Sequence, residues 1–271
     1  MYVDHLTLAD YRSYPSVDVA LSSGVSMFVG ANGQGKTNLV EAIEYLSTLS
    51  SHRVASEVPL VRAGSERAIV RAGVRASLAD DRRILLEVEI TPGRSNRARL
   101  NRSPLKRPRD LVGMLRTVVF SPDDLAVVKG DPAARRAFLD ALVVNRWPRM
   151  AGVRSDYDRI LKQRNTLLKS MSGRSGRSAP DEHAATTLEV WSSQLAEVGA
   201  ELWSARLDTL ADLAPHTAAA YDVIAPTNNE AKVTYRSATE LPPGADRATL
   251  RDALVDARSA RRDGDLAEAG D

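Results

Sequence analysis

The sequence predicts an α/β chain with a nucleotide-binding lobe, which includes an antiparallel β meander, and a second lobe built on a helical hairpin. Over much of residues 1–105 apolar and polar residues alternate with a period of two. A glycine-rich segment stands between a short apolar run and a helical pattern. From Ser121 onward apolar residues recur at helical spacing. We expect lobes at 1–120 and 121–214, and a segment 215–271 that returns in part to the first lobe and ends in a disordered acidic tail.

Composition restricts the class of protein. With 271 residues and 43% hydrophobic content, the chain can bury one sizeable core and a second, smaller one. It has no run of eighteen apolar residues and no signal-peptide pattern at its N-terminus, so we expect a cytoplasmic protein without membrane association. The absence of cysteine excludes disulfides and thiolate metal sites, and the four histidines lack ligand spacing.

The strands of the first lobe follow from alternation. Apolar residues alternate at Val17–Leu21, Val70–Leu78 and Ile84–Ile90, which predicts a half-exposed antiparallel meander. The short, mostly apolar stretch Val25–Val29 predicts a buried strand joined to that meander. A helix is expected directly after the glycine-rich segment, over Asn38–Leu46.

The segment between that run and that helix matches the phosphate-binding pattern G-x-x-x-x-G-K-[ST]. Its glycines let backbone amides close around a β-phosphate, and the helix N-terminus adds partial positive charge. The lysine is placed to reach the β and γ phosphates, and the threonine hydroxyl to ligate Mg²⁺. The predicted nucleotide site therefore comprises Gly30, Ala31, Asn32, Gly33, Gln34, Gly35, Lys36 and Thr37.

Helix signals dominate the second lobe. Ser121 and Asp124 form a capping box, and Asp131-Pro132 begins another helix that extends to Val143. Longer helices are expected at 148–169 and 182–213, joined by the flexible polar connector 172–180. The Leu and Trp stripe of the second long helix indicates packing against the first, which predicts an antiparallel hairpin. Near the end, Lys232–Arg236 predicts a strand and Arg247–Arg262 a charged helix.

Basic residues are concentrated in two regions, which is typical of surfaces that neutralise nucleic-acid phosphates but equally of a solvated charged face. Few aromatic residues lie among them, which favours contact with a duplex backbone over base stacking. The first region holds Arg94, Arg97, Arg99, Arg102, Lys106, Arg107, Arg109 and Arg116, and the second holds Arg146, Arg149, Arg154, Arg159, Lys162, Arg164, Lys169, Arg174 and Arg177.

Several blocks in a fixed order resemble the bacterial RecF family: residues 6–14, 30–44, 119–125, 135–140 and 157–169. The resemblance implies an ATPase head of the SMC and ABC type, with ATP and Mg²⁺ as cofactors. It implies binding to duplex DNA near single-strand gaps, ATP-dependent dimerisation, and cooperation with RecO and RecR in loading RecA during replication, repair and the SOS response. It further implies that Asn38 lies beside the phosphates and that Arg12 contacts the nucleotide.

The sequence departs from this family in two elements. No apolar strand after residue 40 ends in the acidic Walker B pair, and no signature segment follows the phosphate loop. The resemblance places both in a C-terminal part that the chain lacks, so an incomplete sheet is expected and the catalytic residues are unknown. Three functions remain open: a RecF-type DNA repair ATPase, a non-hydrolysing DNA-binding fragment, and a P-loop small-molecule kinase, the last disfavoured because such kinases use an arginine lid.

Overall fold

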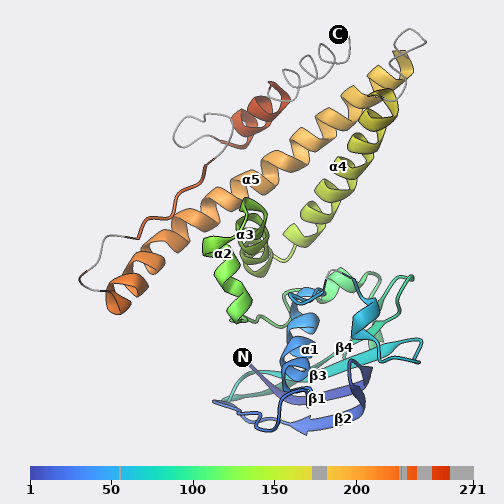
Figure 1. Ribbon diagram of the computed structural model, residues 1–271, viewed down its shortest axis with the longest axis vertical. Helices are drawn as coiled ribbons and strands as arrows, with labels where there is room; N and C mark the ends of the chain where they lie inside the picture. The colour runs from blue at the N-terminus through green and yellow to red at the C-terminus, as the bar shows by residue number, and fades with distance from the viewer. Residues whose placement is uncertain (55, 173–181, 226, 228–230, 237–245, 257–271) are drawn as a thin grey trace. The chain divides into compact units, whose positions relative to one another are not determined.

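The computed structural model describes residues 1–54, 56–172, 182–225, 227, 231–236 and 246–256. The chain divides into two compact units, Met1–Gly130 and Asp131–Asp271 (Figure 1). The first unit holds a β-sheet with one long helix, and the second is helical throughout its regular elements. None of the described helices has the length and apolar character needed to cross a membrane.

The sheet of the first unit has six strands in the order β2-β1-β3-β4-β5-β6, and each pair of neighbours is antiparallel. This confirms the predicted meander. The strands are β1 (Tyr2–Tyr11), β2 (Tyr14–Ala20), β3 (Ala68–Ser77), β4 (Asp80–Ile90), β5 (Arg97–Leu100) and β6 (Ser103–Pro104). Short 3-10 segments occur at η1 (Val58–Leu60), η2 (Pro108–Leu111) and η3 (Pro122–Asp124), and the five-residue helix α2 spans Leu125–Lys129.

One face of the sheet forms the core. Leu6, Val70 and Val88 are fully buried there, as the period-two pattern requires. Helix α1 (Lys36–Thr48) contributes Ala42, Tyr45 and Leu46 to the same hydrophobic cluster, and Figure 1 shows it lying across the sheet. The helix directly follows the phosphate loop, so its packing holds the loop against a rigid layer.

The opposite face of the sheet carries ion pairs across the strands. Glu87 on β4 binds both Arg71 on β3 and Arg99 on β5. Asp4 binds Arg75 and Arg83 at 2.8 and 2.9 Å. A Cβ on Gly73 would approach Arg83 Nη2 to 2.2 Å, so only glycine leaves room for this arginine to cross β3.

The predicted buried strand Val25–Val29 is wrong in this structure. These residues belong to no strand, and Val25, Met27 and Val29 are 94%, 81% and 83% exposed. A strand needs hydrogen-bonding neighbours, and within the described part of the chain no segment pairs with this one. The apolar residues Val118 and Phe120, which precede η3, are exposed in the same way.

The turn between β5 and β6 has a strained backbone. Asn101 and Arg102 have φ of 50° and 70°, the left-handed values of a two-residue type I′ hairpin turn. Asparagine tolerates this region and glycine is usual at the second position, whereas a residue with a Cβ and a long side chain costs about 1 kcal/mol or more. Arg102 therefore occupies a position at which the fold alone favours glycine.

The second unit contains α3 (Pro132–Arg146), α4 (Met150–Ser172) and α5 (Glu182–Ile224). The start of α3 after Asp131 agrees with the sequence prediction. Helices α4 and α5 lie side by side, and bonds from Arg164 to Ser192 and from Arg149 to Glu201 show an antiparallel arrangement (Figure 1). The predicted helical hairpin and its packing stripe are confirmed, since Leu188, Leu195 and Leu202 on α5 are buried.

Two predictions in this unit need correction. Helix α5 does not end at Leu213 but continues through Pro215 to Ile224. A proline inside a helix removes one backbone donor and crowds the carbonyl four residues earlier, and here the turns on either side outweigh that cost. Residues 231–236 form no strand, although Lys232–Arg236 was predicted as one; Tyr235 instead packs its ring against Trp203, with centroids 6.2 Å apart. Residues 247–256 are helical, as expected. Residues 173–180 of the expected connector, residues 257–262 of the expected final helix and the acidic end lie outside the described residues.

Candidate functional site

The phosphate loop leads directly into α1. Gly33 and Gly35 have φ of 81° and 88°, values that L side chains rarely adopt, and Gly35 occupies the N-cap position of the helix. The first amides of α1 therefore point out of the helix end, where partial positive charge attracts an anion. The Lys36 ammonium curls back over the loop and donates to the carbonyl oxygens of Gly30 at 2.8 Å and Ala31 at 2.7 Å.

The turn between β1 and β2 holds this loop in place. The Tyr14 hydroxyl donates to the Gln34 carbonyl oxygen at 3.3 Å, and Asn38 Nδ2 donates to Ser13 Oγ at 3.2 Å. A Cβ on Gly35 would approach both Ser13 Oγ and the Tyr14 hydroxyl to 2.9 Å. A side chain at Gly35 would thus displace Ser13 and Tyr14 as well as strain the backbone.

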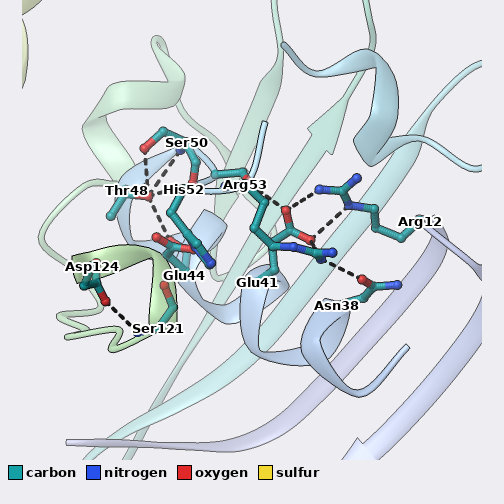
Figure 2. A network of polar contacts seen from close by, with 11 residues as sticks. Arg12, Asn38, Glu41, Glu44, Thr48, Ser50, His52, Arg53, Ser121 and Asp124 are labelled. Carbon is teal, nitrogen blue, oxygen red and sulfur yellow. Dashed lines mark hydrogen bonds and ion pairs between the residues drawn. The ribbon is translucent and has the colours of Figure 1, made fainter. Parts of the chain in front are cut away.

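A network of polar contacts surrounds Glu41, one turn along α1 from Thr37 (Figure 2). The Glu41 side chain is fully buried and accepts hydrogen bonds from Arg12 Nε at 2.9 Å and Arg53 Nη1 at 3.0 Å. Arg12 Nη2 and Ser51 Oγ donate to its other oxygen. Arg53 Nη1 also donates to Asn38 Oδ1 at 3.0 Å, which joins the network to the first turn of α1.

The two arginines give this network a net positive charge beside the phosphate loop. Burial raises the pKa of Glu41, but hydrogen bonds from Arg12 and Ser51 and the charges of Arg12 and Arg53 outweigh it and hold that pKa below its ordinary value. Glu41 is therefore ionised at neutral pH. One carboxylate faces two guanidinium groups, of which Arg12 is 14% and Arg53 is 36% exposed.

The structure places the predicted site residues together at one end of α1. Thr37 lies exposed in the first turn, as ligation of a cation by its hydroxyl requires, and Asn38 lies beside it. Arg12, predicted to face the nucleotide, is bound to Glu41 and to the Pro59 carbonyl oxygen at 3.1 Å. Sequence reasoning missed Glu41, Arg53, Ser13 and Tyr14. Of these four, only Glu41 could have been found from the sequence, because a carboxylate on the apolar face of the expected helix indicates a buried ion pair.

Asp124 caps a helix turn. The Asp124 carboxylate accepts a hydrogen bond from the Ser121 backbone amide, the reciprocal half of the predicted capping box (Figure 2). Within the ranges that the structure describes, no cluster of three or more His, Asp or Glu side chains could hold a metal ion by itself. A cation at this loop would depend on phosphate oxygens together with Thr37.

The two basic regions differ in how many of their charges are paired. In the second region Arg146 binds Asp212, Arg149 binds Glu201 and Arg159 binds Asp156. In the first region Arg99 binds Glu87. Other basic side chains of the first region are exposed and have no acidic partner within 4 Å among the described residues: Arg94, Arg97, Arg102, Lys106, Arg107 and Arg116.

This phosphate loop, set at the start of a helix that packs on an antiparallel sheet, defines a P-loop ATPase. Residues 1–91 match the family model described as AAA ATPase domain. The chain is 57% identical to the DNA replication and repair protein RecF of Cutibacterium acnes, over 98% of this chain and 70% of that protein. It is 50% identical to the protein of the same name from a Nocardioides species, over 100% of this chain and 72% of that protein. The chain belongs to the RecF family.

Solved structures agree with this assignment. A structure of the recombination mediator protein RecF with ATPrS in the RecFOR pathway matches 99% of this chain and 69% of that one, with a TM-score of 0.86 and 26% identity. A structure of RecF with ATP in the same pathway matches 96% of this chain and 67% of that one, with a TM-score of 0.80 and 26% identity.

Proposed function

We propose that this chain is an ATP-dependent DNA-binding protein of recombinational repair and replication. In this proposal it binds duplex DNA near single-strand gaps and helps RecO and RecR to load RecA. The proposal rests on membership of a family whose relatives are named for DNA replication and repair, and on the phosphate loop. Its cellular place would be the cytoplasm, where the DNA lies.

ATP fits the loop that the structure describes. The positive φ angles of Gly33 and Gly35 turn successive backbone amides toward one concave side, the arrangement that cradles phosphates. The Lys36 ammonium already lies over the loop and needs only a change of rotamers to exchange two carbonyl partners for phosphate oxygens. Thr37 would supply a hydroxyl ligand to Mg²⁺, which neutralises phosphate charge when bound.

Arg12 is proposed to contact the nucleotide with a side chain that is already ordered in the absence of ligand. Its guanidinium is fixed by Glu41 and Pro59, so contact with a phosphate would cost little side-chain entropy. Asn38 would assist from the first turn of α1, where Ser13 and Arg53 hold its amide. Both roles would require a phosphate on the loop to come within reach of these side chains.

The unpaired basic residues of the first basic region supply the charge that DNA binding requires. A duplex carries one negative charge per about 1.7 Å, so contact with it releases counterions and makes affinity depend steeply on salt. Two copies of the chain would join around ATP, as family resemblance implies.

The observation that carries the proposal is the loop geometry at Gly33, Gly35 and Lys36 in a RecF family member. The test measures anisotropy of a labelled duplex at several salt concentrations, with and without ATP and Mg²⁺. We expect ATP to tighten binding by about fivefold or more. Lys36→Ala should remove that gain while Lys129→Ala, an exposed lysine of α2, should retain it. No binding by the parent chain at about 50 mM salt would contradict the proposal.

A second candidate is a DNA-binding module that does not hydrolyse ATP. The observation that favours it is that Asp124 caps a helix turn. Asp123-Asp124 is the sequence most similar to a Walker B pair, and a capping role leaves Asp124 unsuited to catalysis. Release of phosphate from ATP should then equal that of Lys36→Ala, with or without duplex DNA. Release clearly above that control would favour the hydrolysing form and make Asp123 and Asp124 the first residues to substitute.

A further inference from the structure

The β5–β6 turn imposes a strained conformation on Arg102, and nothing in the fold explains why an arginine stands there. It stands at the tip of the β5–β6 hairpin with φ of 70°, where glycine would avoid the strain. Its side chain is exposed and makes no hydrogen bond or ion pair with any residue that the structure describes. Strain without a local gain commonly marks a residue that acts on something outside the fold.

The hairpin presents this arginine on a rigid support. The Asn101 amide donates to the Leu85 carbonyl oxygen at 2.8 Å, and the Leu85 amide donates to Asn101 Oδ1 at 2.8 Å, so the turn is tied to β4. The Leu105 amide donates to the Ala98 carbonyl oxygen at 2.9 Å and fixes the chain after β6 along β5. Because β6 is the edge strand, the turn stays open to a partner.

The charges near this hairpin divide into paired and unpaired groups. Toward the centre of the sheet, Glu87 is paired with both Arg71 and Arg99. At the edge, Arg97, Lys106 and Arg107 are exposed and without an acidic partner among the described residues. The bond between Leu105 and Ala98 brings Lys106 and Arg107 back beside Arg97.

The unpaired charges extend along the hairpin over a length that suits a phosphate backbone. Arg97 and Leu100 are the two ends of β5, about 10 Å apart at 3.3 Å per residue, and Arg102 follows at the tip. One strand of a duplex presents about three phosphates over that length. Basic groups at the base and at the tip of a hairpin of this length can therefore reach different phosphates of one DNA strand.

We propose that the β5–β6 hairpin is a DNA-backbone contact of this chain, with Arg102 as its foremost residue and Arg97, Lys106 and Arg107 behind it. This inference rests on the proposed function, because it assigns duplex DNA as the partner. It separates these residues from Arg99, which is already paired with Glu87.

The experiment uses the whole 271-residue chain and measures duplex affinity against salt for Arg102→Gly, Arg102→Ala and Arg82→Ala. Arg82 is the matched control, an exposed arginine on the same sheet that is paired with Asp80. Loss of one phosphate contact lowers the slope of log affinity against log salt by about 0.9. We expect that loss in both Arg102 variants and an unchanged slope in the control.

Thermal unfolding separates this role from a structural one. Arg102→Gly relieves the turn and should raise the melting temperature by about 2–4 °C while weakening DNA binding. A parent-like slope in both Arg102 variants would overturn the inference and leave the proposed function standing. An equal loss of slope in Arg82→Ala would also overturn it, because net charge would then suffice. If the parent chain binds an acidic protein but no duplex at about 50 mM salt, the proposed function fails and the inference fails with it.

Discussion

Glu41 is a fully buried carboxylate between two arginines and a serine, one turn from the phosphate loop. A buried charge is costly unless it is paired, and here each carboxylate oxygen accepts two hydrogen bonds. The residue fixes Arg12 from β1 and Arg53 from the segment after α1 on one side of the helix. At the scale of single residues, this carboxylate organises the positive side chains around the site.

We expect Glu41→Gln to destabilise the first unit by about 3 kcal/mol at neutral pH, because the amide leaves two partly buried guanidinium groups without a counter-charge. The folded pKa of Glu41 lies below its unfolded value, so its stabilising contribution is full above the unfolded pKa of about 4.3 and is lost as pH falls through the folded pKa. Urea unfolding of parent and variant between pH 7 and pH 3 measures this. A stability difference that does not shrink below about pH 4.3 would contradict the account.

At the scale of elements, the sequence pattern correctly predicted those helices and strands that side-chain periodicity determines. The period-two strands, the helix after the phosphate loop and the α4–α5 hairpin follow from side-chain periodicity, and each is present. Val25–Val29 and Lys232–Arg236 satisfy strand propensity equally well, yet a strand also needs a hydrogen-bonding neighbour. Neither segment has such a neighbour among the described residues. Arg53 escaped prediction because only the folded chain brings it to Glu41 and Asn38.

Helices α3 and α5 are joined by Asp140 and Arg206, whose side chains are 10% and 15% exposed and form two bonds of 2.6 and 2.9 Å. Asp140→Ala should lower the free energy of unfolding of the second unit by about 3 kcal/mol, since it leaves a mostly buried guanidinium without its carboxylate. Asp208→Ala, an exposed position on the same helix α5, should change stability by less than about 0.5 kcal/mol. Chemical denaturation of the parent and the two variants measures both changes. Equal effects of the two substitutions would show that the Asp140–Arg206 pair does not stabilise the second unit more than an exposed residue does.

At the scale of the whole molecule, the chain spans about 70% of the length of its RecF relative from Cutibacterium acnes. Exposed apolar residues lie on two segments of the first unit, one between β2 and α1 (Val25, Met27 and Val29) and one just before η3 (Val118 and Phe120). Exposed apolar stretches of this kind favour association, so we expect the purified chain to aggregate more readily than its net charge of +2 alone would suggest.

The proposed ATP-dependent function requires nucleotide binding at the phosphate loop. Titration of a fluorescent ATP analogue with Mg²⁺ into the parent chain, Lys36→Ala and Lys129→Ala tests it most directly. The Lys36 ammonium offsets charge on the β and γ phosphates, whereas Lys129 is exposed and lies outside the loop. We expect saturable binding by the parent and by Lys129→Ala, and its loss in Lys36→Ala with an unchanged melting temperature. Equal affinity of all three proteins for the analogue would contradict the assignment of the loop.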